Sequence, residues 1–174
     1  MVDEIFKTNE KEIMEYYNIR GIFATFRIRW KFFCSWVLHG LAYSNPLSSW
    51  TIRLQKSRGV IIGKNCHISP YVLLDLVYPN QITIDDNVTI GSHVMIFAHS
   101  NPTANLFLKN HKYPRVVKPV HIKSGAVIAP GSIITVGVTI GKNSMISAGS
   151  VVSHDVEDFS VVAGNPARMI KKIE

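Results

Sequence analysis

Residues 120–155 read VHIKSG AVIAPG SIITVG VTIGKN SMISAG SVVSHD, which is six consecutive units of six residues. The third residue of every unit is aliphatic, and the first is small or β-branched. When each unit forms a short strand followed by a turn, both positions point inward, with the larger side chain filling a corner and the smaller one beside it. A fixed short period decides the architecture before local propensities do. The stretch therefore predicts a coil of stacked parallel strands.

The same period runs back to Val60 with two interruptions. Three units cover residues 60–77, a four-residue insert follows at 78–81, and three more units cover 82–99. An excursion at 100–119 then separates these units from the six already quoted. Ten of the twelve third positions are isoleucine, far above chance, and three units per triangular coil predict four coils stacked about 4.8 Å apart. The third positions are Ile62, Ile68, Leu74, Ile84, Ile90, Ile96, Ile122, Ile128, Ile134, Ile140, Ile146 and Val152.

The composition also favours strands. Of the 174 residues, 47% are apolar and 18% charged, so the chain is long enough for one domain and too apolar to be disordered. Isoleucine and valine together number 39 against 9 leucines, and β-branched side chains pack well on pleated sheets. The two cysteines, Cys34 and Cys66, have no metal-binding or redox spacing, and the acidic start shows no secretory signal. We expect a cytoplasmic protein of mainly β structure.

Residues 1–59 lie outside the repeat and are predicted to form a helical, basic and aromatic segment, with residues 60–174 as the second unit. Two interpretations of residues 21–59 stay open. They form a pair of amphipathic helices that cover one end of the main domain, or an interfacial segment that contacts anionic headgroups at the inner face of the membrane. No nucleic-acid-binding module accompanies them, so nucleic acid is not an expected partner. The segment contains no acid, all three tryptophans, and the bases Arg27, Arg29, Lys31, Arg53, Lys56 and Arg58, so it supplies most of the net charge of +7.

The repeated pattern of aliphatic, Gly or Asp, two variable residues, a small residue and a variable one resembles the hexapeptide-repeat acyltransferases. That resemblance implies a left-handed parallel β-helix, a family exception to the right-handed crossover rule. We therefore expect a single-stranded left-handed parallel β-helix of about four coils with an N-terminal helical segment. A loop at residues 100–119 should protrude from it, and a short helix should end the chain.

One short segment at the start of the excursion resembles a known catalytic element. Phe97-Ala98-His99-Ser100-Asn101-Pro102 is similar to the (T/A)-H-x-(x)-P element of sugar O-acetyltransferases of the galactoside, maltose and polysaccharide type. In that family the histidine is the general base, which makes His99 the candidate here. Moving an acetyl group from a thioester to an alcohol requires removal of the hydroxyl proton, and an imidazole ring, with an ordinary pKa of about 6.5, can accept it at neutral pH.

The end of the chain resembles the closing segment of the same acetyltransferases, in which coenzyme A is bound. The matching stretches are residues 149–156 and 164–168. The resemblance implies acetyl-CoA as co-substrate, no metal, and a homotrimer with sites between subunits. His154 replaces the usual Lys or Arg, which weakens the attraction for a coenzyme A phosphate because a histidine is largely neutral at pH 7. The implied cofactor-binding residues are Ala129, Ala148, Ser153, His154 and Arg168.

Two further residues are candidates for acceptor binding. The stretch from Asp75 to Ile84 resembles the D-x-x-Y-P-x-x-I-x-I segment of polysaccharide-type members. Asp75 binds a sugar hydroxyl, orients His99, or is simply a turn residue in its usual slot. Ser69 stands where galactoside-type enzymes have an acceptor-binding asparagine, which argues against a simple galactoside.

These features predict an acetyl-CoA-dependent O-acetyltransferase that acts on a sugar hydroxyl of a surface-polysaccharide precursor, such as a capsule, exopolysaccharide or O-antigen unit. Two alternatives belong to other classes. A γ-carbonic-anhydrase-like zinc enzyme needs an H-x4-H pair, whereas His93 and His99 are six residues apart. A non-enzymatic β-helix scaffold would not require the loop histidine and the closing motif together, and it would not bind coenzyme A.

Overall fold

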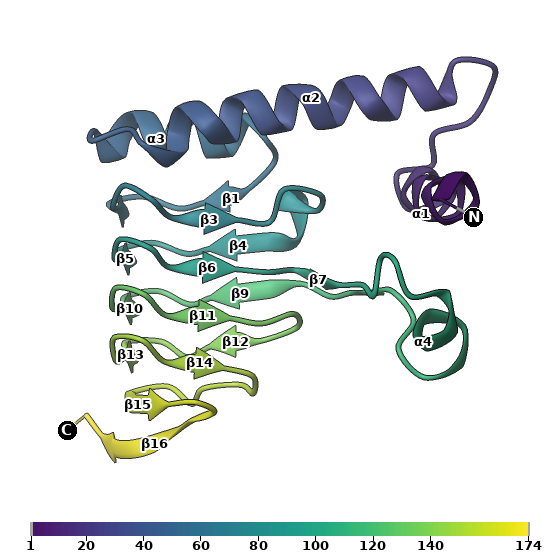
Figure 1. The fold of residues 1–174 in the computed structure, drawn as a ribbon. Helices are drawn as coiled ribbons and strands as arrows, with labels where there is room; N and C mark the ends of the chain where they lie inside the picture. Colours follow the sequence, from purple (N-terminus) through teal and green to yellow (C-terminus); the bar gives the residue numbers. More distant parts are fainter. Residues whose placement is uncertain (1, 174) are drawn as a thin grey trace.

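The computed structural model describes residues 2–173 and begins with three helices (Figure 1). They are α1 (Val2–Tyr16), α2 (Ala24–Tyr43) and α3 (Ser48–Ser57). Helices α2 and α3 lie across one end of a stack of short strands, and α1 lies to one side of it (Figure 1). The chain enters the stack at β1 and descends through it to the C-terminus at the opposite end (Figure 1).

Twelve two- or three-residue strands build three parallel sheets, one strand for each six-residue unit. The chain visits the sheets in rotation, so that β1, β4, β9 and β12 share one sheet, β2, β5, β10 and β13 a second, and β3, β6, β11 and β14 the third. The strands are β1 (Ile61–Ile62), β2 (His67–Ile68), β3 (Leu73–Leu74), β4 (Ile82–Ile84), β5 (Thr89–Ile90), β6 (Met95–Ile96), β9 (Val120–Ile122), β10 (Val127–Ile128), β11 (Ile133–Ile134), β12 (Thr139–Ile140), β13 (Met145–Ile146) and β14 (Val151–Val152).

The register places equivalent positions of successive units above one another. In the second sheet Ile68 pairs with Ile90, Ile90 with Ile128, and Ile128 with Ile146. Every third-position side chain is buried, with at most 6% of its surface exposed. Three in-register parallel sheets of this kind are typical of a left-handed β-helix; the six-residue period predicts the stacked parallel strands, and the family resemblance implies the hand.

The two interruptions of the repeat leave the stack at different places. The four-residue insert contains the short 3₁₀ helix η1 (Pro79–Gln81). The longer excursion begins with β7 (His99–Ser100), which pairs with β8 (Val116–Val117) in an antiparallel ladder, and it carries α4 (Leu106–His111) at its far end. It projects sideways from the stack, as predicted, and ends close to α1 (Figure 1).

The prediction of a short C-terminal helix is wrong. Residues 160–172 form an antiparallel hairpin of β15 (Ser160–Gly164) and β16 (Ala167–Lys172), and β15 continues the second sheet in parallel with β13. The basic residues at 168–172 suggested the solvated last turn of a helix. However, β15 presents a free sheet edge, and the chain returns across the turn at 165–166 to hydrogen-bond to that edge.

The N-terminal helices cover the first coil with their less hydrophobic sides. Helix α2 buries Ile28, Ser35, His39 and Ala42, and α3 buries Thr51 and Gln55. This arrangement agrees with the first of the two interpretations of residues 21–59, with α2 and α3 as the covering pair. Over residues 2–173, no helix has the length and apolar character needed to cross a membrane.

We predict that Ile128→Ala destabilises the protein far more than Ile61→Ala. Ile128 is fully buried, so truncation leaves a cavity between neighbouring coils and should lower the free energy of unfolding by about 2–5 kcal/mol. Ile61 follows the same repeat but is 59% exposed, and its truncation should cost less than about 1 kcal/mol. Urea denaturation followed by circular dichroism measures both, and equal losses would contradict the inward orientation of the third position.

Candidate active site

A histidine and a carboxylate meet where the excursion leaves the stack. His99 Nδ1 lies 2.5 Å from Asp75 Oδ2. Asp75 follows β3 and His99 opens β7, three residues beyond β6, the strand stacked on β3, so the repeat itself brings them together. A carboxylate only accepts hydrogen bonds, so Nδ1 carries a proton and Nε2 of the neutral ring is left free to accept another. The sequence left open whether Asp75 orients His99, and the structure places the Asp75 carboxylate against the His99 ring.

The Asp75 carboxylate is buried and fully engaged. Its Oδ1 accepts the backbone N–H groups of Val77 (2.9 Å) and Tyr78 (3.0 Å), and its Oδ2 accepts that of Ala98 (2.9 Å) in addition to His99. Burial by itself raises the pKa of Asp75, but the hydrogen bonds from His99 and from the two backbone amides of residues 77 and 78 outweigh it, so the pKa lies below its ordinary value. Asp75 is therefore ionised at neutral pH and holds the histidine ring in one orientation.

Tyr78 forms a second wall of the site. Its ring lies edge-on to the His99 ring, with centroids 5.2 Å apart, and it is fully buried. Its hydroxyl accepts a hydrogen bond from Arg115 Nη1 at 3.2 Å. Tyr78 therefore contacts both His99 and Arg115, the residue just before β8.

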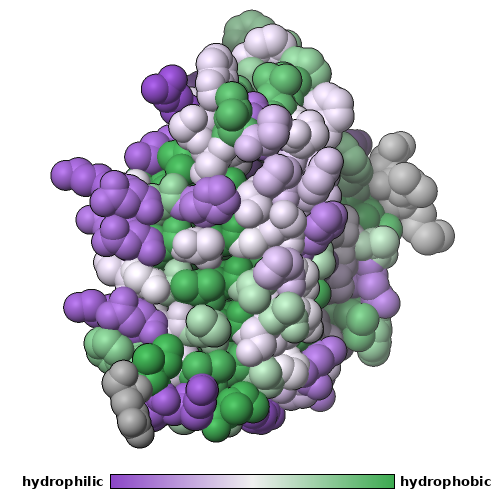
Figure 2. Space-filling model, turned by 90° about the vertical axis from the view of Figure 1, so that its left-hand side faces the viewer, coloured by the Kyte–Doolittle hydropathy of each residue, from purple (hydrophilic) through white to green (hydrophobic). Residues whose placement is uncertain are grey.

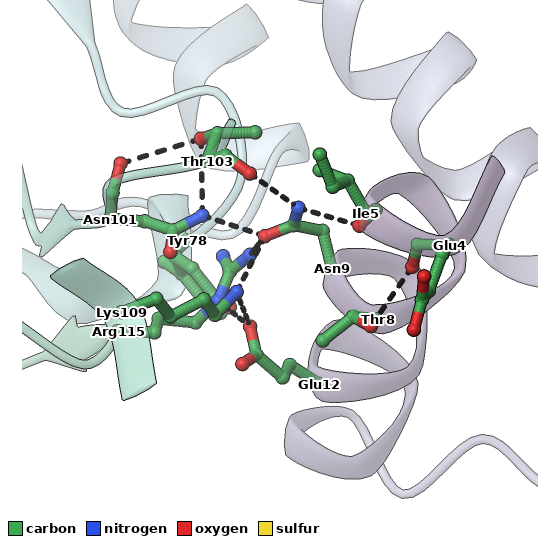
Figure 3. Close-up of polar contacts among 10 residues, drawn as sticks. All are labelled: Glu4, Ile5, Thr8, Asn9, Glu12, Tyr78, Asn101, Thr103, Lys109 and Arg115. Carbon is green, nitrogen blue, oxygen red and sulfur yellow. Dashed lines mark hydrogen bonds and ion pairs between the residues drawn. The ribbon is translucent and has the colours of Figure 1, made fainter. Parts of the chain in front are cut away.

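Helix α1 holds the excursion through a polar cluster (Figure 3). Glu12 Oε2 lies 2.7 Å from both Lys109 Nζ and Arg115 Nε, and Asn9 Oδ1 accepts from the same two side chains at 2.7 and 3.0 Å. The Asn9 amide also donates to the carbonyl of Thr103 at 2.9 Å. Lys109 is buried, so its charge needs this partner set. The N-terminal helix thus fixes the loop that carries His99.

A buried arginine supports Asp75 from the other side. Arg58 follows α3, and its guanidinium donates to the Asp75 carbonyl at 2.7 Å, to Ser35 Oγ at 3.1 Å and to His39 Nδ1 at 3.1 Å. Burial lowers the pKa of Arg58 to about 10, with Asp75 opposing that shift, so Arg58 is charged at neutral pH. Burial and the Arg58 charge lower the pKa of His39 to about 4, so His39 is neutral and accepts.

Three of the other predicted residues lie at a different corner of the coil. Ser69 follows β2, Ala129 follows β10, and Ala148 lies in the turn after β13, so all three stand between the second sheet and the third. His99 and Asp75 stand at the next corner, beyond the third sheet. Ser69 contacts only His67 Nε2 through its hydroxyl, at 3.4 Å. A single chain does not bring these residues to the histidine.

The remaining predicted residues gather near the end of the stack. Ser153 and His154 follow β14, at the same corner as His99, and the Ser153 hydroxyl lies 3.0 Å from His154 Nδ1. His154 and Arg168 line one pocket of about 310 Å³ between the last coil and β16. Both side chains are exposed, and Arg168 contacts only the carbonyl of Ala167. An anionic group could reach either of them from solvent.

A second histidine–carboxylate pair provides a contrast. His121 Nε2 lies 2.9 Å from Asp85 Oδ1 on the outer side of the first sheet. The side chains of this pair are 42% and 35% exposed, against 22% and 0% for His99 and Asp75. Water therefore competes for the surface pair, whereas the buried carboxylate fixes its histidine. Among residues 2–173, no cluster of three or more His, Cys, Asp or Glu side chains is placed to hold a metal ion.

The supporting residues are not recognisable from the sequence. Arg58 was counted with a basic surface segment, but only 7% of it is exposed. Tyr78 lay inside the segment used for the polysaccharide resemblance without a role of its own. Glu12 and Asn9 gave no signal, because a carboxylate and an amide on an exposed helix are ordinary. Only their contacts with the excursion, seen in the structure, identify Glu12 and Asn9 as supporting residues.

The comparisons with known proteins find similarity to transferases. A family model described as the hexapeptide repeat of succinyl-transferase matches residues 131–154. The serine acetyltransferase of Bacillus subtilis (strain 168) is 34% identical over 112 residues, covering 64% of this chain and 39% of that protein. The galactoside O-acetyltransferase of Escherichia coli (strain K12) is 35% identical over 115 residues, covering 64% and 56%. The chain therefore spans about half the length of the curated relatives it matches, or less.

A solved structure extends the likeness to the fold. A galactoside acetyltransferase in complex with coenzyme A aligns with a TM-score of 0.66 at 27% identity, over 84% of this chain and 82% of that one. The alignment covers more of the chain than the sequence matches do, so the resemblance in fold reaches beyond the region of sequence similarity.

We predict that Asp75→Asn destabilises the fold most at neutral pH. The amide replaces an acceptor with a donor beside the N–H groups of Ala98 or Val77 and Tyr78, and the lost hydrogen bonds should cost about 1–3 kcal/mol. Because the folded pKa of Asp75 is depressed, the carboxylate stabilises the protein above the unfolded pKa of about 4 and loses that contribution as the pH falls through the folded pKa.

The difference between wild type and Asp75→Asn in urea denaturation should therefore narrow in acid. Asp155→Asn is the matched control, since Asp155 is an exposed aspartate that accepts one backbone N–H, from Thr139. At neutral pH, Asp155→Asn should lower the free energy of unfolding less than Asp75→Asn does. A difference for Asp75→Asn that grows as the pH falls would contradict the assigned hydrogen bonds.

Proposed function

We propose that the chain belongs to the hexapeptide-repeat acetyltransferase family and is an acetyl-CoA-dependent O-acetyltransferase that acts on a sugar hydroxyl. The observation that carries this proposal is the contact between His99 Nδ1 and the buried Asp75 carboxylate. This contact leaves Nε2 of His99 free to accept a proton, which is what a general base requires. The ring lies at the point where the excursion leaves the stack.

In the proposed reaction His99 Nε2 takes the proton of the sugar hydroxyl as the oxygen attacks the carbonyl carbon of the acetyl thioester. The tetrahedral intermediate carries the negative charge on the former carbonyl oxygen, where a backbone N–H stabilises it. The carbon–sulfur bond then breaks, the acetyl group stays on the sugar, and the imidazolium returns its proton to the coenzyme A thiolate. Asp75 stabilises the imidazolium between these steps and is a positioning residue.

Coenzyme A is proposed to run along the coil corners toward the last turn of the stack. Ala129 and Ala148 offer small side chains at one corner, and Ser153, His154 and Arg168 lie near the end of the stack. Arg168 is the stronger candidate for a phosphate, because it stays charged at neutral pH and its guanidinium is exposed.

A homotrimer with sites between subunits would unite the two groups of residues. His99 and Ala148 lie at different corners of the stack, in the second and the fourth coil, and a neighbouring copy could bring its own second corner to the histidine. The outward residues of the second sheet include Val127, Met145 and Val161 in successive coils. Figure 2, which views the molecule from the side where β5, β10 and β13 lie in Figure 1, shows a band of hydrophobic side chains on this face. A subunit interface would cover such a band.

The proposed acceptor is a precursor of a surface polysaccharide. The support is the segment from Asp75 to Ile84, which resembles polysaccharide-type members, together with Ser69 in place of an asparagine. A screen of free, nucleotide-linked and lipid-linked sugars would identify the acceptor. Analysis of the acetylated product would then identify the hydroxyl.

We predict that His99→Ala abolishes acetyl transfer and leaves the fold intact. Removal of a general base should lower kcat by about 10²–10⁴-fold. Radiolabelled acetyl-CoA with a panel of sugar acceptors and L-serine measures transfer, and His121→Ala, at the exposed pair, is the matched control that should retain it. Full transfer by the His99 variant would refute the assignment, as would transfer to serine alone. Absence of coenzyme A binding by wild type would favour a scaffold.

The trimer is tested by complementation. We predict that Ala148→Trp blocks the coenzyme A corner and is inactive alone, as His99→Ala is. Co-expression of the two variants with different tags should yield mixed oligomers that regain transfer, because one interface then holds an intact histidine and an intact second corner. Light scattering supplies the subunit number. A monomeric mass, or mixed oligomers without transfer, would contradict sites shared between copies.

A further inference from the structure

Helix α2 carries a row of large apolar side chains on the side turned away from the β-helix. We call this row the aromatic face. Its seven members follow a spacing of one, three or four residues and are between 36% and 71% exposed. They are Phe23, Phe26, Trp30, Phe33, Trp36, Val37 and Leu41. Nothing in residues 2–173 covers them, although large apolar groups on a protein surface usually mark a contact site.

The aromatic face is an ordered ladder. The rings of Phe26 and Trp30 lie 6.4 Å apart between centroids, those of Trp30 and Phe33 5.6 Å, and those of Phe33 and Trp36 6.4 Å. The helix buries its other side, which includes Ile28. The ladder spans residues 26–36, which is about 15 Å of helix, and α2 itself lies across the end of the strand stack (Figure 1).

The charges that α2 and α3 carry are all positive. The chain has no acidic residue between Glu15 and Asp75. Arg27 lies on α2 beside the aromatic face, and Arg53 and Lys56 lie on the exposed side of the neighbouring α3. Two other bases of this region are already engaged, since Arg29 pairs with Glu10 and Arg58 is buried under α2. The exposed cations near the ladder therefore have no carboxylate partner on these helices.

We propose that the aromatic face docks on an anionic lipid bilayer, with α2 lying in the plane of the interface. Tryptophan and phenylalanine partition into the boundary between headgroups and acyl chains, while the flanking cations attract anionic headgroups. The helix is not built to span the bilayer. A second copy of the chain fits less well, because facing ladders would bring the same cations together without an acid between them.

Docking of this kind orients the rest of the molecule. Helices α2 and α3 cap the first coil, so the strand stack extends away from the bilayer, and the excursion with His99 projects parallel to the surface (Figure 1). The candidate active site would then lie in the aqueous layer next to the lipid headgroups. The inference concerns a surface distinct from that site and does not require the proposed function.

Tryptophan fluorescence reports on α2 and α3, because all three tryptophans lie there: Trp30 and Trp36 of the aromatic face are 57% and 64% exposed, and Trp50 on α3 is 54% exposed. The full chain should co-sediment with vesicles containing phosphatidylglycerol, with a blue shift of its emission. Lipids with bromine in their acyl chains should quench that emission. Binding should weaken with salt and be much weaker to vesicles of phosphatidylcholine alone.

Substitution separates the apolar from the electrostatic contribution. F26S/W30S/F33S should lower the vesicle partition coefficient by about 100-fold or more. The matched control I61S/M169S/I170S removes equally exposed apolar side chains from the strands and should bind as wild type does. R27E/R53E/K56E keeps the ladder and should lose the preference for anionic vesicles.

The proposal is overturned if wild type ignores anionic vesicles, or if the aromatic and control triples bind equally. A wild-type oligomer that dissociates on F26S/W30S/F33S without any lipid effect would assign the aromatic face to a second copy instead. Should that triple fail to fold by circular dichroism, the charge variant and acyl-chain quenching of wild type still decide, because a protein held by charge alone would not be quenched.

Discussion

The register of the inward isoleucines is the constraint on which the rest of the structure depends. Each third-position side chain stacks on its counterpart in the next coil, as Ile90 does on Ile128, and the parallel ladder fixes the spacing between coils. A slip of one residue in any strand would turn its buried side chain outward. Because the register of each strand is fixed, a loop can leave the stack and return without shifting the strands on either side of it. The same register holds side chains that are far apart in sequence at fixed distances from one another.

Asp75 uses that constraint. It occupies the turn slot after one coil while His99 follows the same strand of the next, so their contact is a consequence of stacking. The amides of residues 77, 78 and 98 would otherwise be buried without partners, and the carboxylate satisfies all three. Arg58 binds the carbonyl of the same residue, and Tyr78 packs on the histidine. The site is thus rigid before any ligand binds, which is how preorganised charge lowers a barrier.

What the sequence could predict follows from the range of the interactions. Strands from Ile62 to Val152 were predictable because one local unit repeats, and His99 because a motif marks it. The hairpin at 160–172 was not, since its partner is a sheet edge that exists only after the stack has formed. Glu12 and Arg115 lie 103 residues apart, and no periodic signal relates them. The proposed corner residues Ser69 and Ala148 were identifiable by resemblance, but which corner they occupy depends on the three-sheet closure.

Helix α2 shows why the interpretation of the N-terminal segment stayed open. It carries apolar residues on two sides: the side with Ile28 and Ala42 covers the first coil, and the side with Phe26 and Trp30 faces outward. A helix that needed only to cap the stack would carry polar residues on its outer side, because each exposed aromatic ring costs solubility and adds nothing to the fold. Capping and docking are therefore not alternatives. Ser35 and His39 are on the inner side, where Arg58 binds them, whereas the bases Arg27, Arg29 and Lys31 are exposed. Exposed aromatic rings together with exposed bases are expected of a helix that lies between a protein and an anionic bilayer.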